Sequence, residues 1–191
     1  MKHILVLLFV LFSHIIVCSQ TILQPDTCID MKYYKSYCTK TPLQVSYCTY
    51  ILYKPKSNVS RYGCNFHGSC KHFDYNKSGY DKGHLVPAED MEYNKESMNN
   101  SFVWWNCVPQ TPKLNRGNWR VEEEKWHNYA NQDSLFIIVG ACNFTNGIPK
   151  YCYKIVKSLS KKKVISITIY NQQGNKIPIP KNFLKQFNIH I

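Results

Sequence analysis

The chain has 191 residues and a formal net charge of +12, with 24 lysines and arginines against 12 aspartates and glutamates. Its length fits one domain of ordinary size, and the lack of a Gly-rich phosphate loop and of a Gly-x-Ser-x-Gly turn argues against a nucleotide-binding α/β enzyme and an elbow-type serine hydrolase. The excess of positive charge favours a polyanionic partner, nucleic acid before a membrane surface or a glycan, although a basic surface that only keeps a protein soluble explains the charge equally well.

Residues 1–19 have the features of a secretory signal peptide. A short basic start leads into an apolar run, Ile4–Phe12, and small residues precede a cleavage site before Gln20. The run is short for a membrane span, so a retained anchor is a weaker alternative, as is a lipoprotein linkage through Cys18. The sequence therefore predicts a secreted protein with a single domain over residues 20–191 and no membrane attachment after the leader is removed.

Removal of the leader leaves eight cysteines, which is an even number. In an exported chain this count predicts disulfide bonds, and short separations favour the pairings Cys64–Cys70, Cys142–Cys152 and Cys38–Cys48. Zinc ligation is the alternative for one group, because the residue types and spacing fit at Cys64, His67, Cys70 and His72. Outside the cell the disulfide interpretation is the stronger one.

The segments after the leader predict an α+β chain. Residues 31–37 and 43–53 are rich in Tyr, Val and Ile and predict two strands, and the polar residues 54–80 predict a long loop. One prominent helix is predicted over residues 115–132. Further predicted strands are residues 84–87, 101–108, 134–142, 150–158 and 162–171. Together they predict a mostly antiparallel sheet with one helix, and the pattern of residues 183–191 is ambiguous.

The predicted helix carries carboxylates next to inward-facing aromatic side chains. Trp119 and Trp126 are seven residues apart and share one helical face, and Glu122 and Glu123 lie between them on or near that face. A buried carboxylate is costly unless a metal ion or an arginine meets it. Alternatively, both glutamates point outward and pair with basic neighbours, and periodicity alone supports both arrangements. Asn115 lies at the start of the helix, where an asparagine is typical as an N-cap.

The stretch GYDKGHLVPAEDM, residues 79–91, places a group that titrates near neutral pH between charges of both signs. That group is His84, and an unperturbed histidine pKa of about 6.5 suits a general base. Asp81 would orient the site, and Gly83 would let the backbone pass close to a substrate. As bulk sequence, the same stretch is only a polar turn.

Several ordered blocks resemble the DNA/RNA non-specific endonucleases, the family that includes endonuclease G. The blocks are YDKGHLVPAEDM, NCVPQTPKLNRGNW and EEEKW, and the resemblance extends over nearly all of residues 34–170. It implies a ββα-metal nuclease fold, in which a histidine lies on a strand, an asparagine opens the following helix, and one divalent ion sits between them. We expect disulfides to stabilise this fold here.

The resemblance assigns roles to particular residues. It implies that His84 activates the attacking water, that Asn115 is the single direct protein ligand of the metal, and that Glu123 holds waters of the metal shell. Helical phase alone would instead place Glu122 nearest the face of Asn115. The other expected catalytic residues are Asp81, Lys82 and Asn106, and the expected substrate-binding residues are Lys82, Arg116, Arg120 and His127. Magnesium suits the site because it retains water and takes oxygen ligands, with manganese as the alternative.

Two positions depart from the family pattern. Lys82 stands where the family has an arginine, and His127 stands where some relatives place one. Because lysine cannot bind a phosphate through two parallel hydrogen bonds, contact with the transition state would be weaker, and Arg116 and Arg120 are near enough to compensate.

The function that the resemblance implies is a secreted, magnesium-dependent endonuclease that cuts DNA and RNA and leaves 5′ phosphates. One alternative is a catalytically weak or inactive nucleic-acid-binding relative, and the presence of the candidate base and metal ligand argues against it. Another is a cysteine-rich binding module, which leaves the ordered motifs unexplained. The family contains dimers, but no exposed apolar stripe in the sequence indicates a homodimer here.

Overall fold

The computed structural model describes residues 22–54, 59–68 and 71–187. The predicted leader, residues 1–19, and Cys70 lie outside these ranges, so the leader cleavage and the Cys64–Cys70 pairing stay predictions. No helix in the described part of the chain is long and apolar enough to span a membrane.

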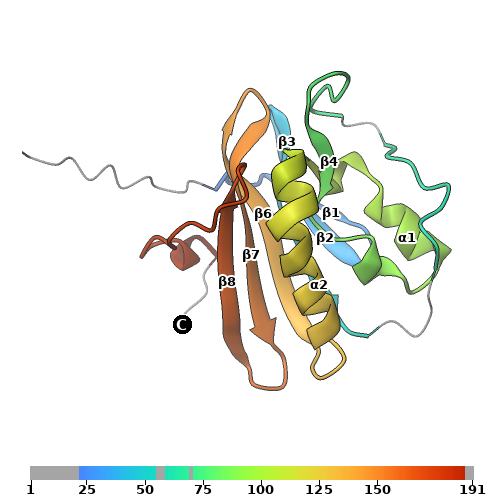
Figure 1. Ribbon diagram of the computed structural model, residues 1–191, viewed down its shortest axis with the longest axis vertical. Coiled ribbons are helices and arrows are strands. Elements are labelled where there is room, and N and C mark those ends of the chain that lie inside the picture. The colour runs from blue at the N-terminus through green and yellow to red at the C-terminus, as the bar shows by residue number, and fades with distance from the viewer. Residues whose placement is uncertain (1–21, 55–58, 69–70, 188–191) are drawn as a thin grey trace, which may run out of the picture.

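A six-stranded antiparallel sheet forms the centre of the fold (Figure 1). In spatial order its strands are β1 (Thr27–Asp30), β2 (Tyr34–Lys40), β3 (Leu43–Leu52), β6 (Leu135–Thr145), β7 (Ile148–Ser158) and β8 (Lys163–Asn171). The central strands β6 and β7 carry mostly apolar side chains because both of their faces are buried over most of their length. Val139 and Val156 point into the larger hydrophobic core, and Ile138 and Ile155 point into a second core on the opposite face.

A second layer covers the face of the larger core. It consists of the two-stranded sheet β4 (Asp81–His84) and β5 (Cys107–Gln110), the helical turn Leu114–Trp119, and helix α2 (Arg120–Tyr129). Figure 1 shows α2 lying along the large sheet, with β4 and the short helix α1 (Lys95–Ser101) to one side. Short 3₁₀ turns occur at Glu89–Met91, Trp104–Asn106 and Leu184–Phe187.

The predicted helix over residues 115–132 is confirmed, but it is divided. Gly117 has φ −101° and ψ −120°, which are not helical values, and it separates the first turn from α2. Trp119 and Trp126 are both buried against the sheet, so the predicted inward face is correct. The first turn displaces Asn115 from the position of a simple N-cap, and no side-chain cap bond forms at either start.

The strand expected at residues 84–87 is displaced toward the N-terminus. The observed strand is β4, and it ends at His84. It ends there because the backbone groups of Leu85 and Val86 bond to Asn106. Leu85 donates its N–H to the backbone of Asn106, and both backbone groups of Val86 bond to the Asn106 side chain. The side chain of Asn106 thus replaces a strand partner at this point.

The strand expected at residues 101–108 is also wrong in most of its length. Helix α1 ends at Ser101, and the chain passes through the turn Trp104–Asn106 before β5 begins at Cys107. The helix forms because Asn94 and Ser97 cap each other reciprocally at its start.

No two of the seven cysteines in the described ranges are bonded to each other. The predicted Cys142–Cys152 bond is wrong, because Cys142 lies opposite Tyr151 and Cys152 lies opposite Ala141, so the two thiols point to opposite faces of the sheet. Cys38 and Cys48 lie on diagonal positions of β2 and β3 and are not bonded to each other. The buried cysteines therefore pack as small apolar side chains.

Candidate active site

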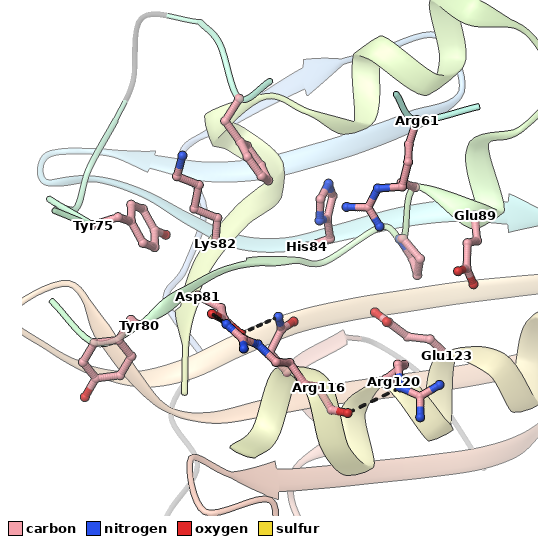
Figure 2. Close-up of a pocket in the computed structure, with 14 residues that line it drawn as sticks. Arg61, Tyr75, Tyr80, Asp81, Lys82, His84, Glu89, Arg116, Arg120 and Glu123 are labelled. Carbon is pink, nitrogen blue, oxygen red and sulfur yellow. Dashed lines mark hydrogen bonds and ion pairs between the residues drawn. The ribbon is translucent and has the colours of Figure 1, made fainter. Parts of the chain in front are cut away.

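A cleft of about 610 Å³ opens beside β4 and the beginning of the helical segment (Figure 2). Its lining includes most of the residues to which the sequence analysis assigns a role: Asp81, Lys82, His84, Asn115, Arg116, Arg120 and Glu123. The other lining residues are Arg61, Phe66, Tyr75, Tyr80, Pro87, Ala88 and Glu89. Segments that are distant in the sequence thus meet at one concave surface.

Asp81 joins the strand to the helical segment. Its carboxylate accepts two hydrogen bonds from Arg116, at 2.8 and 2.7 Å, and one from Asn115 Nδ2 at 3.0 Å. The Arg116 guanidinium is the main reason that the pKa of Asp81 is lowered, so the carboxylate stays charged. Because Asp81 binds the amide nitrogen of Asn115, the orientation of that amide is fixed and its oxygen is directed away from Asp81.

His84 lies at the end of β4 between two aromatic rings. Its ring centroid is 4.8 Å from that of Phe66 and 4.8 Å from that of Phe102. Burial, together with the charge of Arg61, lowers the pKa of His84 to about 3. Its Nε2 atom is buried and has no hydrogen-bond partner. His84 is therefore neutral near pH 7 and has a ring nitrogen that can accept a proton.

The lowered pKa of His84 predicts a particular loss of stability in acid. The unfolded chain binds a proton at this histidine as the pH falls below about 6.5, whereas the folded chain resists it until about pH 3. Relative to His84→Asn, the wild type should therefore lose unfolding free energy between pH 7 and pH 4, on the order of 3 kcal/mol. Urea denaturation at several pH values measures this difference. A difference that stays constant over this range would contradict the prediction, and the exposed His67, changed to Asn, is the control.

Both glutamates of α2 turn inward, which resolves the alternatives left open by periodicity. Glu122 is 6% exposed, and its carboxylate accepts hydrogen bonds from Trp126 Nε1 at 2.6 Å and from Tyr170 OH at 3.3 Å. Glu123 lines the cleft, and its Oε1 atom is buried without a hydrogen-bond partner. Glu122 therefore stabilises the packing of the helix, and Glu123 is the carboxylate that faces the site.

Lys154 on β7 is the buried cation behind Glu123. Its side chain is 1% exposed, its Nζ has no hydrogen-bond partner, and this atom lies 5.1 Å from the ring centroid of Trp119. Burial raises the pKa of Glu123 to about 8, and the charge of Lys154 acts against that shift. At a pKa of about 8 Glu123 is largely protonated near pH 7, and the positive charge of Lys154 favours its ionised form.

The residues at the centre of the cleft fit a hard divalent ion. Asn115 offers an amide oxygen, and Glu123 offers a buried carboxylate oxygen that has no partner. Within the described ranges, no three His, Cys, Asp or Glu side chains gather closely enough to hold a metal. A site with so few protein oxygens suits magnesium, which keeps several of its waters when bound.

Asn106 lies beneath the site and does not line the cleft. It is 0% exposed, and its amide bonds to both backbone groups of Val86, at 2.8 and 2.9 Å, and to the carbonyl of Ser101 at 2.9 Å. These bonds fix the backbone that follows His84. In the structure the side chain of Asn106 thus positions the backbone that follows His84, and a direct catalytic role for Asn106 stays a prediction.

The structural reason for a glycine at position 83 differs from the expected one. A Cβ atom at this position would lie 2.4 Å from Cδ and from Oε1 of Gln110, which is itself 0% exposed. The glycine thus makes room for a side chain on β5 and not for a substrate.

Replacing Gly83 with alanine should therefore destabilise the fold by about 1–3 kcal/mol, because the buried Gln110 cannot move aside without cost. Chemical denaturation measures the loss. Adding Gln110→Ala removes the contacting atoms and should restore part of it, whereas a double variant as unstable as the sum of the single changes would contradict this explanation.

The remaining predicted residues lie in different environments. The Lys82 Nζ atom is 5.6 Å from the ring centroid of Trp104, and Arg120 forms an ion pair with Glu124 at the edge of the cleft. His127 Nδ1 lies 3.0 Å from Asp90 Oδ1 and does not line the cleft. Contact between His127 and a substrate stays a prediction.

Sequence reasoning missed two residues of the site. Arg61 belongs to a loop without periodic pattern, yet it lines the cleft and its charge acts on His84. Lys154 lies in a strand whose alternation suggests a surface lysine. An apolar run on both sides of a single lysine, as in CYKIV, is the only local signal that could have indicated its burial.

Comparison with known proteins assigns the family. A model of the DNA/RNA non-specific endonucleases matches residues 28–188. The chain belongs to this family. The structure superposes on a chain of the crystal structure of the EndoG/EndoGI complex, which concerns the mechanism of EndoG inhibition. The TM-score is 0.67 and the sequence identity is 16%, over 86% of this chain and 84% of that chain. The expected ββα-metal nuclease fold is therefore confirmed.

Curated relatives are similar over shorter segments. A nuclease of Nostoc sp. is 33% identical over 90 residues, which are 43% of this chain and 33% of that protein. The mitochondrial endonuclease G of Bos taurus is 32% identical over 77 residues, which are 36% of this chain and 26% of that protein. The mitochondrial nuclease EXOG of Xenopus laevis is 26% identical over 126 residues, which are 54% of this chain and 33% of that protein. The chain spans a third or less of the length of these relatives.

Proposed function

We propose that this member of the family is a secreted, metal-dependent endonuclease that hydrolyses phosphodiester bonds of DNA and RNA and leaves 5′ phosphates. The observation that supports it most is the neutral His84, whose Nε2 has no partner, in the same cleft as the oxygen atoms of Asn115 and Glu123.

His84 acts as the general base. A water molecule adjacent to Nε2 loses a proton to the ring as its oxygen attacks the phosphorus in line. The low pKa of His84 keeps the ring unprotonated before this step, and the aromatic rings on both sides restrict its orientation. A base of this kind contributes about 10²- to 10⁴-fold to the rate.

Asn115 and Glu123 would hold magnesium, or manganese in its place, Asn115 directly and Glu123 through water. When bound, the ion would offset negative charge on the phosphate and on the departing oxygen. Asp81 contributes by fixing the amide of Asn115, and Lys154 contributes by stabilising the charge of Glu123.

The basic residues of the cleft bind the phosphate backbone. Arg61, Lys82 and Arg120 line it, whereas Arg116 is held by Asp81. Contacts to phosphates position a nucleic acid and carry no sequence information, so cleavage should be weakly selective for sequence. Secretion and a homodimer stay predictions at this point.

The test compares DNA and RNA oligonucleotides of one sequence, incubated with the purified residues 20–191 in magnesium. The proposal expects both to be cut and the products to be joined by a ligase without prior phosphorylation. Products that need a kinase before ligation would contradict the stated chemistry. Binding without cutting would support the weak or inactive relative instead.

A further inference from the structure

The two ends of the cleft have different chemistry. In Figure 2, Tyr75, Tyr80 and Lys82 lie toward one end, whereas Arg61, Glu89 and Arg120 lie toward the other, with His84 between them. The arginine end suits phosphate oxygens. The tyrosine end instead presents aromatic rings, which a phosphate backbone alone does not stack on.

The rings at the tyrosine end are held in a packed wall. Tyr75 stacks on Trp104 with centroids 5.8 Å apart and an interplanar angle of 19°, and its hydroxyl lies 3.3 Å from Cys107 Sγ. Phe73 contacts both tyrosines edge to face, with centroids 4.9 Å from Tyr75 and 5.8 Å from Tyr80. Because the wall is already ordered, a planar ligand would lose little free energy in ordering it.

A cation lies beside these rings. Lys82 is the exposed residue next to Asp81, and its Nζ is 5.6 Å from the centroid of Trp104 and 5.9 Å from that of Phe66. A positive charge next to aromatic faces is the combination that binds single-stranded nucleic acid, because the cation meets the backbone while the bases stack on the rings.

A base can reach such a ring only when it is unpaired and unstacked, since duplex bases present only their edges in the grooves. We propose that the tyrosine end is a subsite for an unpaired base next to the scissile phosphate, and that single-stranded nucleic acid is consequently the preferred substrate. This inference rests on the proposed function. Tyr80 is the platform, because Tyr75 is already engaged by Trp104 and Cys107.

The experiment measures kcat/KM on one single-stranded oligonucleotide and on its duplex, for wild type, Tyr80→Ala and Tyr80→Phe. Loss of a stacked base should lower the single-strand-to-duplex ratio by about 5- to 150-fold in Tyr80→Ala, and Tyr80→Phe should retain the ratio. Tyr62→Ala, at a tyrosine that is 90% exposed and outside the cleft lining, is the matched control.

An abasic residue moved along the single strand locates the base. At one position beside the cut, the abasic residue should slow cleavage by the wild type. At the same position it should cause no further slowing of Tyr80→Ala, compared with the intact strand. The inference would be overturned if Tyr80→Ala lost the same factor in kcat/KM on the single strand and on the duplex. It would also be overturned if, at every abasic position, the effects of the abasic residue and of Tyr80→Ala were independent. If the wild type cleaves no substrate, the proposed function fails. The inference is then still decided by fluorescence anisotropy, which compares the affinity of His84→Ala for the single strand with its affinity for the duplex.

Discussion

Replacing His84 with alanine should lower kcat/KM on an oligonucleotide by about 10²- to 10⁴-fold, because the variant has no group to take the proton of the attacking water. Burial keeps the ring of His84 unprotonated at pH 7, and its Nε2 is uncommitted. Initial rates at saturating magnesium give the value, and His67→Ala is the control for loss of a histidine outside the cleft.

The affinity of His84→Ala for the same oligonucleotide should change little, because the basic residues that line the cleft remain. A variant that loses binding and rate in equal measure would indicate that His84 shapes the cleft and is not the base. An unchanged rate would exclude His84 from the reaction.

Replacing Lys154 with methionine should destabilise the fold by about 1–3 kcal/mol at pH 9, where Glu123 is ionised, since it leaves the buried carboxylate without a countercharge. Lys154 is 1% exposed, so solvent cannot take over this role. Chemical denaturation measures the change. Lys157→Met is the control on the same strand, because Lys157 is exposed and its replacement should alter stability by less than about 0.5 kcal/mol.

A double-mutant cycle tests whether the effect passes through Glu123. Lys154→Met combined with Glu123→Gln removes both buried charges, so it should be more stable than the sum of the single changes predicts. Strict additivity would show that the two charges do not interact, and would remove Lys154 from the explanation of the site.

The sequence predicts the centre of the site because its residues lie in short contiguous motifs. His84 and Asn115 each belong to a block that identifies the family, and the buried face of the helix follows from the spacing of Trp119 and Trp126. The resemblance also chooses Glu123, which lines the cleft in the structure, while Glu122 bonds to Trp126.

The residues that the sequence does not predict depend on tertiary packing. Lys154 is buried next to the ring of Trp119, which belongs to the turn Leu114–Trp119, and only the apolar residues on both sides of the lysine indicate this burial locally. Arg61 reaches the cleft from a loop, where position is set by contacts with Phe102 and not by periodicity. Asn106 matches a family motif, yet only the structure shows that its side chain bonds to the backbone of Val86.

The most direct test of the central claim uses covalently closed circular plasmid, which an enzyme can open only by cutting within the strand. Incubated with residues 20–191 and magnesium, the plasmid should become nicked and then linear, the reaction should stop when a chelator is added, and it should resume when magnesium is restored in excess. Plasmid that stays closed while its mobility shifts, or cleavage that continues unchanged in the chelator, would contradict a metal-dependent endonuclease.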